Sequence, residues 1–385
     1  MLQRGGAVAR YCIFSAQYVP HVGGIERYTE QLSKTLVSRG HEVDIVTNNT
    51  EGAEEFISID GLTVVRLPCI SLFSGRFPLP KPCGSRSKAI SWIYGRCYDG
   101  VLINARFYPH SLLGMSVARK QGLRPVVLDH GSAYLTFGNK VIDIAVRAYE
   151  HCITAIGKLY GPHYYGVSRR SVEWLQQFGI KGEGILPNSI DAKAYRDSAS
   201  SRQFREEIGV AQDELMVSYV GRLIPEKGIF SLLRAAKECD SQGLRVHFVI
   251  AGSGSLEGAV CSASDNVSYV GKLSQSDVSA LLIQSDVFCL PSRSEGFATC
   301  LLEAGACGTP AITTDVGGAR EVMPDGDYGL MLESSDAEKI VSSIRWCIGR
   351  RRELAAMGDR LQERVDNKFS WEEAAERVED ALRSK

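Results

Sequence analysis

Residues 217–238 read VSYVGRLIPEKGIFSLLRAAKE, and this stretch indicates the fold class. It opens with a short run of β-branched and aromatic residues that stops at Gly221, as a buried strand does. From Gly228 onward the apolar residues recur at helical spacing. A strand, a glycine-bounded loop and a helix in that order form the repeating unit of a parallel α/β sheet.

The same alternation runs along the rest of the chain. Helical patterns occupy 25–39, 228–239, 274–284 and 335–348. Strand-like runs lie between helical patterns at 11–17, 41–49, 62–68, 125–131 and 163–168, and again at 215–221, 246–252, 267–273, 286–292 and 310–316. Because this series occurs twice, we predict an α/β chain of two doubly wound, Rossmann-like lobes with helices on both faces of each parallel sheet.

The expected lobes are residues 1–188 and 189–368. A chain of 385 residues is long for one core and suits two. The junction falls in ILPNSIDAKAYRDSASS (185–201), where proline, asparagine and serine interrupt the periodicity. Ligands of such sheets bind beyond the carboxyl ends of the strands. Loops that directly follow strands are therefore the candidate site.

Charge is divided unevenly between the halves. Residues 1–188 hold 21 Lys and Arg against 14 Asp and Glu, whereas residues 189–385 hold 23 against 31. A basic half suits an anionic partner such as lipid headgroups or a phosphorylated acceptor. The alternative is that the two lobes attract each other. No nucleic-acid partner is expected.

Cysteine usage and hydropathy indicate the compartment. The eleven cysteines are scattered and include no Cys-x-x-Cys pair with zinc spacing, which favours reduced thiols in a cytosolic protein. No apolar run approaches the roughly 18 residues that span a bilayer. We therefore expect a cytoplasmic protein that is neither exported nor integral to a membrane.

Three of the loops after strands combine glycine with a polar or charged residue. Gly23 and Gly24 precede a helix, where backbone N–H groups approach an anion closely. His130 follows the strand at 125–129 and suits contact with a hydroxyl group. Arg222 and Lys227 flank the loop of the opening stretch and form a candidate diphosphate clamp at a helix N-terminus. Each pattern also has a purely structural interpretation, as a turn, a core histidine or a solvated cation.

The fourth loop lies in SRSEGFATCLLEAGACGTP (292–310) and contains two carboxylates eight residues apart. We expect the helix to begin near Ala298, which places Glu295 in the loop at its mouth and Glu303 within it. Unpaired N–H groups at such a helix start suit a phosphate or a sugar hydroxyl. One carboxylate for a sugar, another for a ribose, and a diphosphate clamp nearby together predict a nucleotide-sugar ligand.

At this point the motifs resemble a known family. The chain is similar, from about residue 12 to 382, to the retaining glycosyltransferases of family 4 with the GT-B fold. The resemblance rests on Gly-Gly-x-Glu (23–26), His130-Gly131, PNSID (187–191), GRLIPEKG (221–228), AGSG (251–254), EGFATCLLE (295–303), ACGTP (306–310), GGARE (317–321) and FSWEEAAERV (369–378), all in the family's order.

The resemblance implies metal-independent transfer from a nucleoside diphosphate sugar, with retention at the anomeric carbon and no cofactor. Arg222 and Lys227 match the family's diphosphate-binding pair, and Glu295 and Glu303 match the carboxylates near the donor sugar and on the ribose. The resemblance further implies that the helix within 369–385 packs back on the first lobe. The other matching positions are Gly296, Phe297 and Ala298 in the donor-contacting segment, His130 beside the transferred sugar, and Gly23 and Gly24 in the loop that closes on the phosphates.

Several local patterns limit or qualify these expectations. Ser189 and Ala298 stand where the family has glycine, and Ala298 could constrain the sugar. IAGSGSLEG (250–258) lacks the third glycine of a dinucleotide fingerprint, so nicotinamide binding is rejected. Asp325 and Asp327 are better explained by a turn than by a metal site. No metal is therefore predicted.

Two segments of the first lobe are candidates for contact with the acceptor. Residues 71–98 contain five Lys or Arg and no acidic residue, interleaved with Phe73, Phe77, Trp92 and Tyr94, which suits anionic lipid. The helical segment 139–160 bears an apolar stripe beside Lys140, Arg147 and Lys158, and we expect this stripe to face the core. The stripe consists of Val141, Ile144, Ala145, Ala148, Cys152, Ala155, Ile156 and Leu159.

The sequence therefore predicts an enzyme that moves a hexose or N-acetylhexosamine from a UDP- or GDP-sugar to a hydroxyl group. The expected acceptor is a growing cell-surface polysaccharide or a polyprenyl-diphosphate-linked glycan, at the inner face of the cell membrane. The alternatives are a nucleotide-sugar epimerase or hydrolase on the same fold, and a catalytically silent partner subunit. The intact set of two cations and two carboxylates argues against a silent subunit.

Overall fold

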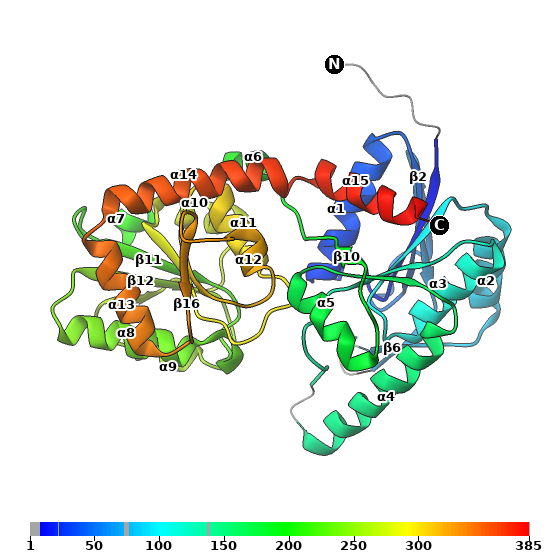
Figure 1. Cartoon of the computed structure of the whole chain (residues 1–385), viewed down its shortest axis with the longest axis horizontal. Coiled ribbons are helices and arrows are strands. Elements are labelled where there is room, and N and C mark those ends of the chain that lie inside the picture. The colour runs from blue at the N-terminus through cyan, green and yellow to red at the C-terminus, as the bar shows by residue number, and fades with distance from the viewer. Residues whose placement is uncertain (1–7, 22, 73–76, 137–138, 385) are drawn as a thin grey trace. The chain divides into compact units, whose positions relative to one another are not determined.

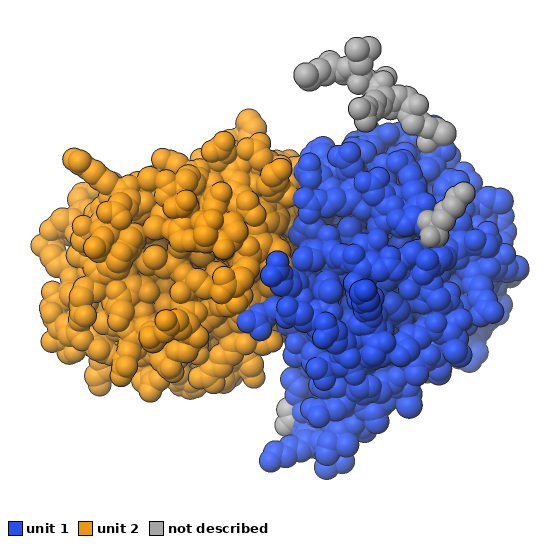
Figure 2. Space-filling view, in the orientation of Figure 1, with its two compact units in different colours: residues 1–187, 371–385 blue, residues 188–370 orange. Residues whose placement is uncertain are grey.

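The structure is a computed structural model that describes residues 8–21, 23–72, 77–136 and 139–384. It divides the chain into two compact units, shown in separate colours in Figure 2. Unit 1 comprises residues 1–187 with 371–385, and unit 2 comprises residues 188–370. Among the described residues, no helix is both long and apolar enough to cross a bilayer.

Over its described residues, unit 1 contains an eight-stranded sheet in the order β10-β9-β8-β7-β1-β2-β4-β3. All neighbours pair in parallel except β3 with β4. Its strands are β1 (Arg10–Ser15), β2 (Glu42–Asn48), β3 (Phe56–Ile59), β4 (Leu62–Leu67), β7 (Gly100–Asn104), β8 (Val126–Asp129), β9 (His163–Gly166) and β10 (Gly184–Ile185). A separate antiparallel ribbon joins β5 (Cys69–Leu72) to β6 (Phe77–Pro80).

Helices cover the unit 1 sheet. They are α1 (Gly24–Ser38), α2 (Gly84–Gly95), α3 (Pro109–Lys120), α4 (Lys140–Lys158), α5 (Arg169–Leu175), the short turn η1 (Gln176–Phe178) and α15 (Trp371–Arg383). The last of these, α15, lies alongside α1 (Figure 1), where Trp371 packs on Tyr28 and Glu379 pairs with Arg39 at 2.7 Å. The C-terminal helix is thus part of unit 1.

Unit 2 contains a parallel six-stranded sheet over its described residues, in the order β13-β12-β11-β14-β15-β16. Its strands are β11 (Leu215–Val220), β12 (Val246–Ala251), β13 (Val267–Tyr269), β14 (Val287–Leu290), β15 (Ala311–Thr314) and β16 (Gly329–Leu332). Figure 1 shows helices on both faces of this sheet. They are α6 (Ala192–Asp197), α7 (Phe204–Ile208), η2 (Pro225–Lys227), α8 (Ile229–Ser241), α9 (Glu257–Cys261), α10 (Gln275–Gln284), α11 (Thr299–Ala306), α12 (Ala319–Val322), α13 (Ala337–Ile348) and α14 (Arg351–Lys368).

Burial explains the strand sequences. Strands β11 and β14 are almost wholly buried, because helices cover both faces, and so they read as continuous apolar runs rather than alternating ones. The predicted α/β class and doubly wound arrangement are confirmed. The helix expected to begin near Ala298 begins at Thr299.

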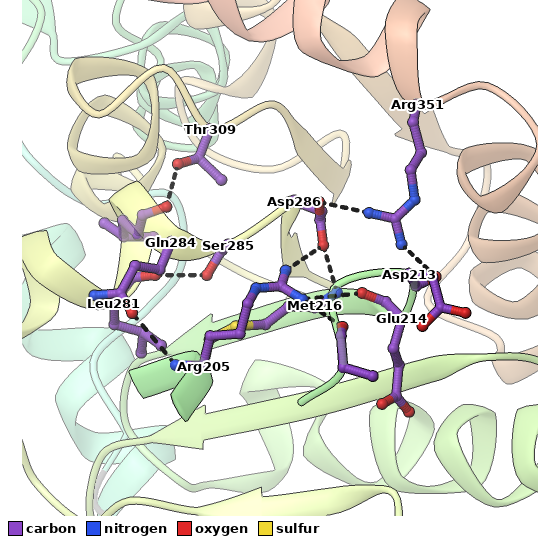
Figure 3. A network of polar contacts seen from close by, with 12 residues as sticks. Arg205, Asp213, Glu214, Met216, Leu281, Gln284, Ser285, Asp286, Thr309 and Arg351 are labelled. Carbon is purple, nitrogen blue, oxygen red and sulfur yellow. Dashed lines mark hydrogen bonds and ion pairs between the residues drawn. The ribbon is translucent and has the colours of Figure 1, made fainter. Parts of the chain in front are cut away.

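A polar network joins several elements at the amino ends of the unit 2 strands (Figure 3). Asp286, directly before β14, accepts hydrogen bonds from Arg205 at 2.7 Å and from Arg351 at 2.9 Å. The same carboxylate accepts from the backbone N–H of Met216 in β11 at 2.7 Å. One side chain therefore links α7, β11 and α14 to the start of β14.

Candidate active site

The candidate residues of unit 2 lie at the carboxyl ends of adjacent strands. In the strand order, the chain runs outward in one direction from β11 and in the other from β14, so the two form the topological switch point. The loop after β11 contains Arg222 and Lys227, and the loop after β14 contains Glu295. The crevice at such a point is where open α/β sheets bind ligands. The fold therefore brings three of the predicted residues to one edge of the sheet.

Gly228 allows the two loops to approach each other. Its φ of 75° is left-handed, and an added Cβ would lie 2.0 Å from the carbonyl oxygen of Pro291. Both the backbone conformation and the lack of space therefore exclude a side chain at position 228. Tyr219 fixes the other end of the first loop, because its hydroxyl donates to the carbonyl oxygen of Arg222 at 3.0 Å.

Lys227 and Glu295 form an ion pair across the switch point. The ammonium Nζ lies 2.5 Å from Glu295 Oε1, and both side chains are largely buried. Ser292 donates to the same carboxylate oxygen at 2.8 Å. The backbone oxygen of Ser292 in turn accepts from the hydroxyl of Thr314. Lys227 is thus held by the Glu295 carboxylate, whose own orientation is fixed by Ser292.

Arg222 differs from Lys227 in its surroundings. Its side chain is exposed, and within the described parts of the chain its guanidinium has no carboxylate partner. An arginine in the loop that also contains Lys227 offers a planar, multidentate donor set that matches phosphate oxygens. Together the two cations can contact a diphosphate without a metal.

Glu303 lies on α11, one turn beyond Cys300. The Cys300 thiol has a raised pKa because it is buried, with further contributions from Glu295 and Glu303. Burial, with the influence of both carboxylates, keeps the thiol protonated. Cys300 and Ser292 were not predicted as site residues from the sequence, since neither belongs to a charged motif.

The segment between Glu295 and α11 turns its side chains inward. Phe297 is buried, and its ring occupies the space above Gly318, where an added Cβ would lie 2.2 Å from the ring. Ala298 is 2% exposed, so its methyl group does not line an open surface. Gly296 precedes them as the link to Glu295. The backbone of this segment, rather than its side chains, is what a ligand could contact.

In unit 1, the loop after β1 ends at Gly23, and Gly24 is the first residue of α1. Gly23 precedes α1, and an added Cβ there would lie 2.2 Å from Glu26 Oε2. Glu26 also lies 3.0 Å from His21 Nδ1. Gly24 has open space around its Cα. The helix N-terminus expected to receive an anion therefore has its own carboxylate folded against it.

His130 follows β8 and lies beside α1. Its ring meets Tyr28 edge-on at 5.2 Å, and its Nε2 lies 3.0 Å from Asn104 Oδ1. The amide of Asn104 donates to Thr29 Oγ1 at 2.8 Å, and Thr29 donates to Ile25 O at 2.8 Å. Because this chain fixes the orientation of Asn104, His130 must donate through Nε2, which leaves the lone pair on Nδ1. Burial lowers the pKa of His130 to about 3.

A buried charge network supports the His130 loop. Arg106 pairs with Asp129, the residue before His130, at 2.7 Å and with Glu150 of α4 at 2.9 Å, and all three are at most 1% exposed. The Arg106 guanidinium stacks on Phe178, 3.7 Å from the ring centre. Glu150 also accepts from the N–H of Leu135 in the loop, at 2.9 Å. This network was not predicted, because its members are distant in sequence.

The structure contradicts the expectation for segment 139–160, whereas lipid contact by segment 71–98, in which Lys81 and Lys88 are exposed, stays a prediction. In 71–98, Trp92 and Tyr94 pack against the unit 1 core, Arg86 is buried, and Arg96 pairs with Asp44. Phe73 lies outside the described residues. The expectation that the stripe of 139–160 faces the core is wrong, because all eight of its residues are exposed. The face of α4 opposite the stripe packs on the protein instead.

Comparisons with known proteins agree with this geometry. The family model Glycosyltransferase Family 4 matches residues 22–193, and Glycosyl transferases group 1 matches residues 200–364. A Corynebacterium glutamicum GDP-mannose-dependent monoacylated alpha-(1-6)-phosphatidylinositol monomannoside mannosyltransferase is 25% identical over 97% of each chain. The gpi3 subunit of the Schizosaccharomyces pombe phosphatidylinositol N-acetylglucosaminyltransferase is 24% identical over 94% of this chain and 78% of its own.

Solved structures show the same fold. Sucrose-phosphate synthase from Thermosynechococcus elongatus superimposes with a TM-score of 0.72 at 21% identity, over 97% of this chain and 98% of that one. The HepE protein of Anabaena in complex with UDP-glucose superimposes with a TM-score of 0.69 at 16% identity, over 97% of this chain and 99% of that one. With models of the family matching both halves and the GT-B fold shared throughout, the chain belongs to the family 4 glycosyltransferases.

Proposed function

We propose that this glycosyltransferase moves a hexose or N-acetylhexosamine from a UDP- or GDP-sugar to a hydroxyl group of a lipid-linked or growing glycan acceptor. Transfer proceeds with retention at the anomeric carbon and without a metal. The observation that supports this most directly is the Lys227–Glu295 pair at the switch point of unit 2, with the exposed Arg222 in the same loop as Lys227.

The two cations act on the leaving group. When the bond between the anomeric carbon and the diphosphate oxygen breaks, negative charge develops on the phosphate. Lys227 and Arg222 offset that charge where a metal would otherwise do so, because fixed charges in a partly buried site need little reorganisation. When the donor binds, Lys227 leaves Glu295 and contacts the phosphate instead. The Glu295 carboxylate can then accept hydrogen bonds from hydroxyl groups of the donor sugar.

The remaining residues orient the sugar and the nucleotide. Glu303 accepts from the ribose hydroxyls, and the backbone of Gly296 to Ala298 contacts the donor. His130 remains neutral at physiological pH because of its lowered pKa. It therefore serves as a hydrogen-bond acceptor through Nδ1 for a hydroxyl of the transferred sugar, rather than as a proton donor.

The relatives suggest the kind of substrate. Both curated relatives named above act on phosphatidylinositol lipids, one with GDP-mannose and the other transferring N-acetylglucosamine, while the HepE structure holds UDP-glucose. These descriptions favour an acceptor embedded in a membrane. Both UDP-sugars and GDP-sugars remain candidates for the donor.

The test is thermal stabilisation by nucleotides, since a ligand raises the melting temperature by mass action. We expect a shift with UDP or GDP, or the matching sugar, that EDTA does not change. Lys227→Met should abolish most of the shift, whereas Lys237→Met, on the same unit but distant from the loops, should retain it. A chain that no nucleotide stabilises would contradict the proposal and favour a silent subunit. Sugar release without transfer to any lipid acceptor would favour a hydrolase.

A further inference from the structure

An apolar stripe lies exposed along α4. Its larger members are among the most exposed apolar side chains of the described chain, with Val141 at 77%, Ile144 at 70% and Leu159 at 75%. Ala145, Ala148, Cys152, Ala155 and Ile156 continue it and are exposed as well. A continuous apolar surface of this kind commonly marks an interaction site.

The opposite face of α4 holds the helix on unit 1. Glu150, Ile153, Thr154 and Gly157 are buried there, and Gly157 approaches α3 so closely that an added Cβ would lie 3.2 Å from Met115. Asn139 caps the helix by accepting from the N–H groups of Val141 and Ile142. The helix is therefore fixed on one side, and it presents the stripe on the other. Figure 1 shows α4 on the outside of unit 1.

The helix has the geometry of an interfacial helix. At about 100° per residue, the eight stripe residues fall within an arc of about 120° over a helix roughly 28 Å long. Lys140, Arg147 and Lys158 are exposed and fall within about 20° of one another along one border of that arc. Long cationic side chains beside an apolar face suit the boundary between acyl chains and anionic headgroups.

The acidic residues of α4 do not oppose such a partner. Glu150 is buried in its ion pair with Arg106. Asp143 lies one turn from Lys140 and from Arg147, about 40 to 60° farther from the stripe than the cationic row, and accepts from the hydroxyl of Thr136 at 2.8 Å. A second copy of the chain would bring the same row of cations, whereas an anionic bilayer complements it. The excess of basic residues in 1–188 favours the same partner.

We propose that α4 docks unit 1 on an anionic lipid surface, with the stripe inserted among the headgroups and the three cations on lipid phosphates. The proposal rests on the proposed function in assuming that the acceptor is held in that membrane. It also connects docking to the site: Glu150, Arg106 and Asp129 tie α4 to the loop that begins with His130. A docked helix would thereby fix the His130 loop relative to the bilayer.

The test measures binding of the full chain to vesicles by co-sedimentation. Vesicles of phosphatidylcholine with 30% phosphatidylglycerol, chosen as about a third anionic lipid, are compared with pure phosphatidylcholine. We expect binding to the anionic vesicles that weakens with salt, and at least a tenfold loss in the triple variant Val141→Ser, Ile144→Ser, Leu159→Ser. The matched control is Ile59→Ser, which alters a side chain that is 63% exposed on β3 of the same unit.

Three outcomes would overturn the proposal: the triple variant binds like the unchanged chain, the control loses as much, or both vesicle types bind equally. A stripe-dependent dimer without vesicle binding would assign the stripe to a second copy. The nucleotide shift, measured without vesicles on the triple variant, separates the two proposals. A retained shift with lost vesicle binding supports docking by α4, whereas vesicle binding without any nucleotide shift leaves docking intact and contradicts the enzymatic proposal.

Discussion

At the scale of single residues, Lys227 has two possible partners, Glu295 and a donor phosphate. Changing Glu295→Gln removes the competing charge but retains the shape and the contact from Ser292. We expect turnover to fall by roughly 10² to 10³, as when one group that stabilises the transition state is lost. Affinity for the nucleoside diphosphate should remain or increase, because Lys227 no longer pairs with a carboxylate. Steady-state kinetics and calorimetric titration with the free nucleotide measure the two effects.

Glu303→Gln provides the matched comparison. If Glu303 accepts from ribose hydroxyls, the change should weaken nucleotide binding about 10- to 100-fold, the range for hydrogen bonds to a charged group. The rate at saturating donor should then change little. Equal, small effects of the two variants would contradict the assignment of separate roles to the two carboxylates.

Histidine burial predicts a pH dependence of stability. Burial lowers the pKa of His110 to about 4 and of His130 to about 3, against about 6.5 in an unfolded chain. Below pH 6.5 the unfolded state therefore binds more protons than the folded state. The free energy of unfolding is not reduced by these histidines above pH 6.5, and it declines as the pH falls toward the folded pKa. For His110 this titration lowers the free energy of unfolding by about 2 kcal/mol at pH 5.

Denaturant unfolding at pH 7.5 and pH 5 measures this loss in the unchanged chain and in His110→Gln. Glutamine can still donate to the carbonyl oxygen of Val46, which lies 2.8 Å from His110 Nε2. The variant should lose about 2 kcal/mol less between the two pH values than the unchanged chain. An identical loss would show that His110 does not titrate in this way.

Sequence reasoning located residues whose loop position implied a role. Lys227 and Glu295 lie in segments that follow strands, so the parallel fold alone brings these segments to one edge of the sheet. Asn104 and Arg106 were missed for the opposite reason. Their partners, such as Thr29 and Glu150, lie tens of residues away, and a hydrogen bond between distant segments leaves no local pattern.

At the scale of elements, the order and type of strands and helices could be read from periodicity, whereas the direction of a helix face could not. An amphipathic pattern shows that α4 has an apolar side, but a core-facing side and a lipid-facing side have the same spacing. The orientation of α4 is set by its opposite face, where Gly157 and buried Glu150 pack on the protein. The expectation that the stripe faces the core rested on the helical spacing of its apolar residues, and the Arg106 partner that allows Glu150 to be buried instead leaves no local pattern in the sequence.

At the scale of the whole molecule, unit 2 separates its candidate site from its supporting network along the strands. In unit 2 the crevice residues lie at the carboxyl ends, and the Asp286 network lies at the amino ends (Figure 3). The two edges share the strands but no side-chain contact among those described. Stability and ligand binding should therefore be separable by mutation.

Asp286→Ala tests that separation. The change leaves the guanidinium groups of Arg205 and Arg351 and the N–H of Met216 without their acceptor. We expect a loss of about 2 to 3 kcal/mol, because the carboxylate is only 23% exposed and accepts charge-assisted hydrogen bonds. In a unit of this size that corresponds to a fall in melting temperature of roughly 4 to 12 °C. The shift produced by UDP or GDP should remain.

The control is Asp213→Ala, in the same corner of unit 2. The Asp213 side chain is 64% exposed and pairs with Arg245 at the surface, while its backbone oxygen, which the mutation retains, accepts from Arg351. An exposed ion pair contributes less than about 1 kcal/mol, so Asp213→Ala should melt within a few degrees of the unchanged chain. If the two variants melt alike, Asp286 does not support the sheet as described. If Asp286→Ala abolishes the nucleotide shift at temperatures where it remains folded, the two edges of the sheet are coupled.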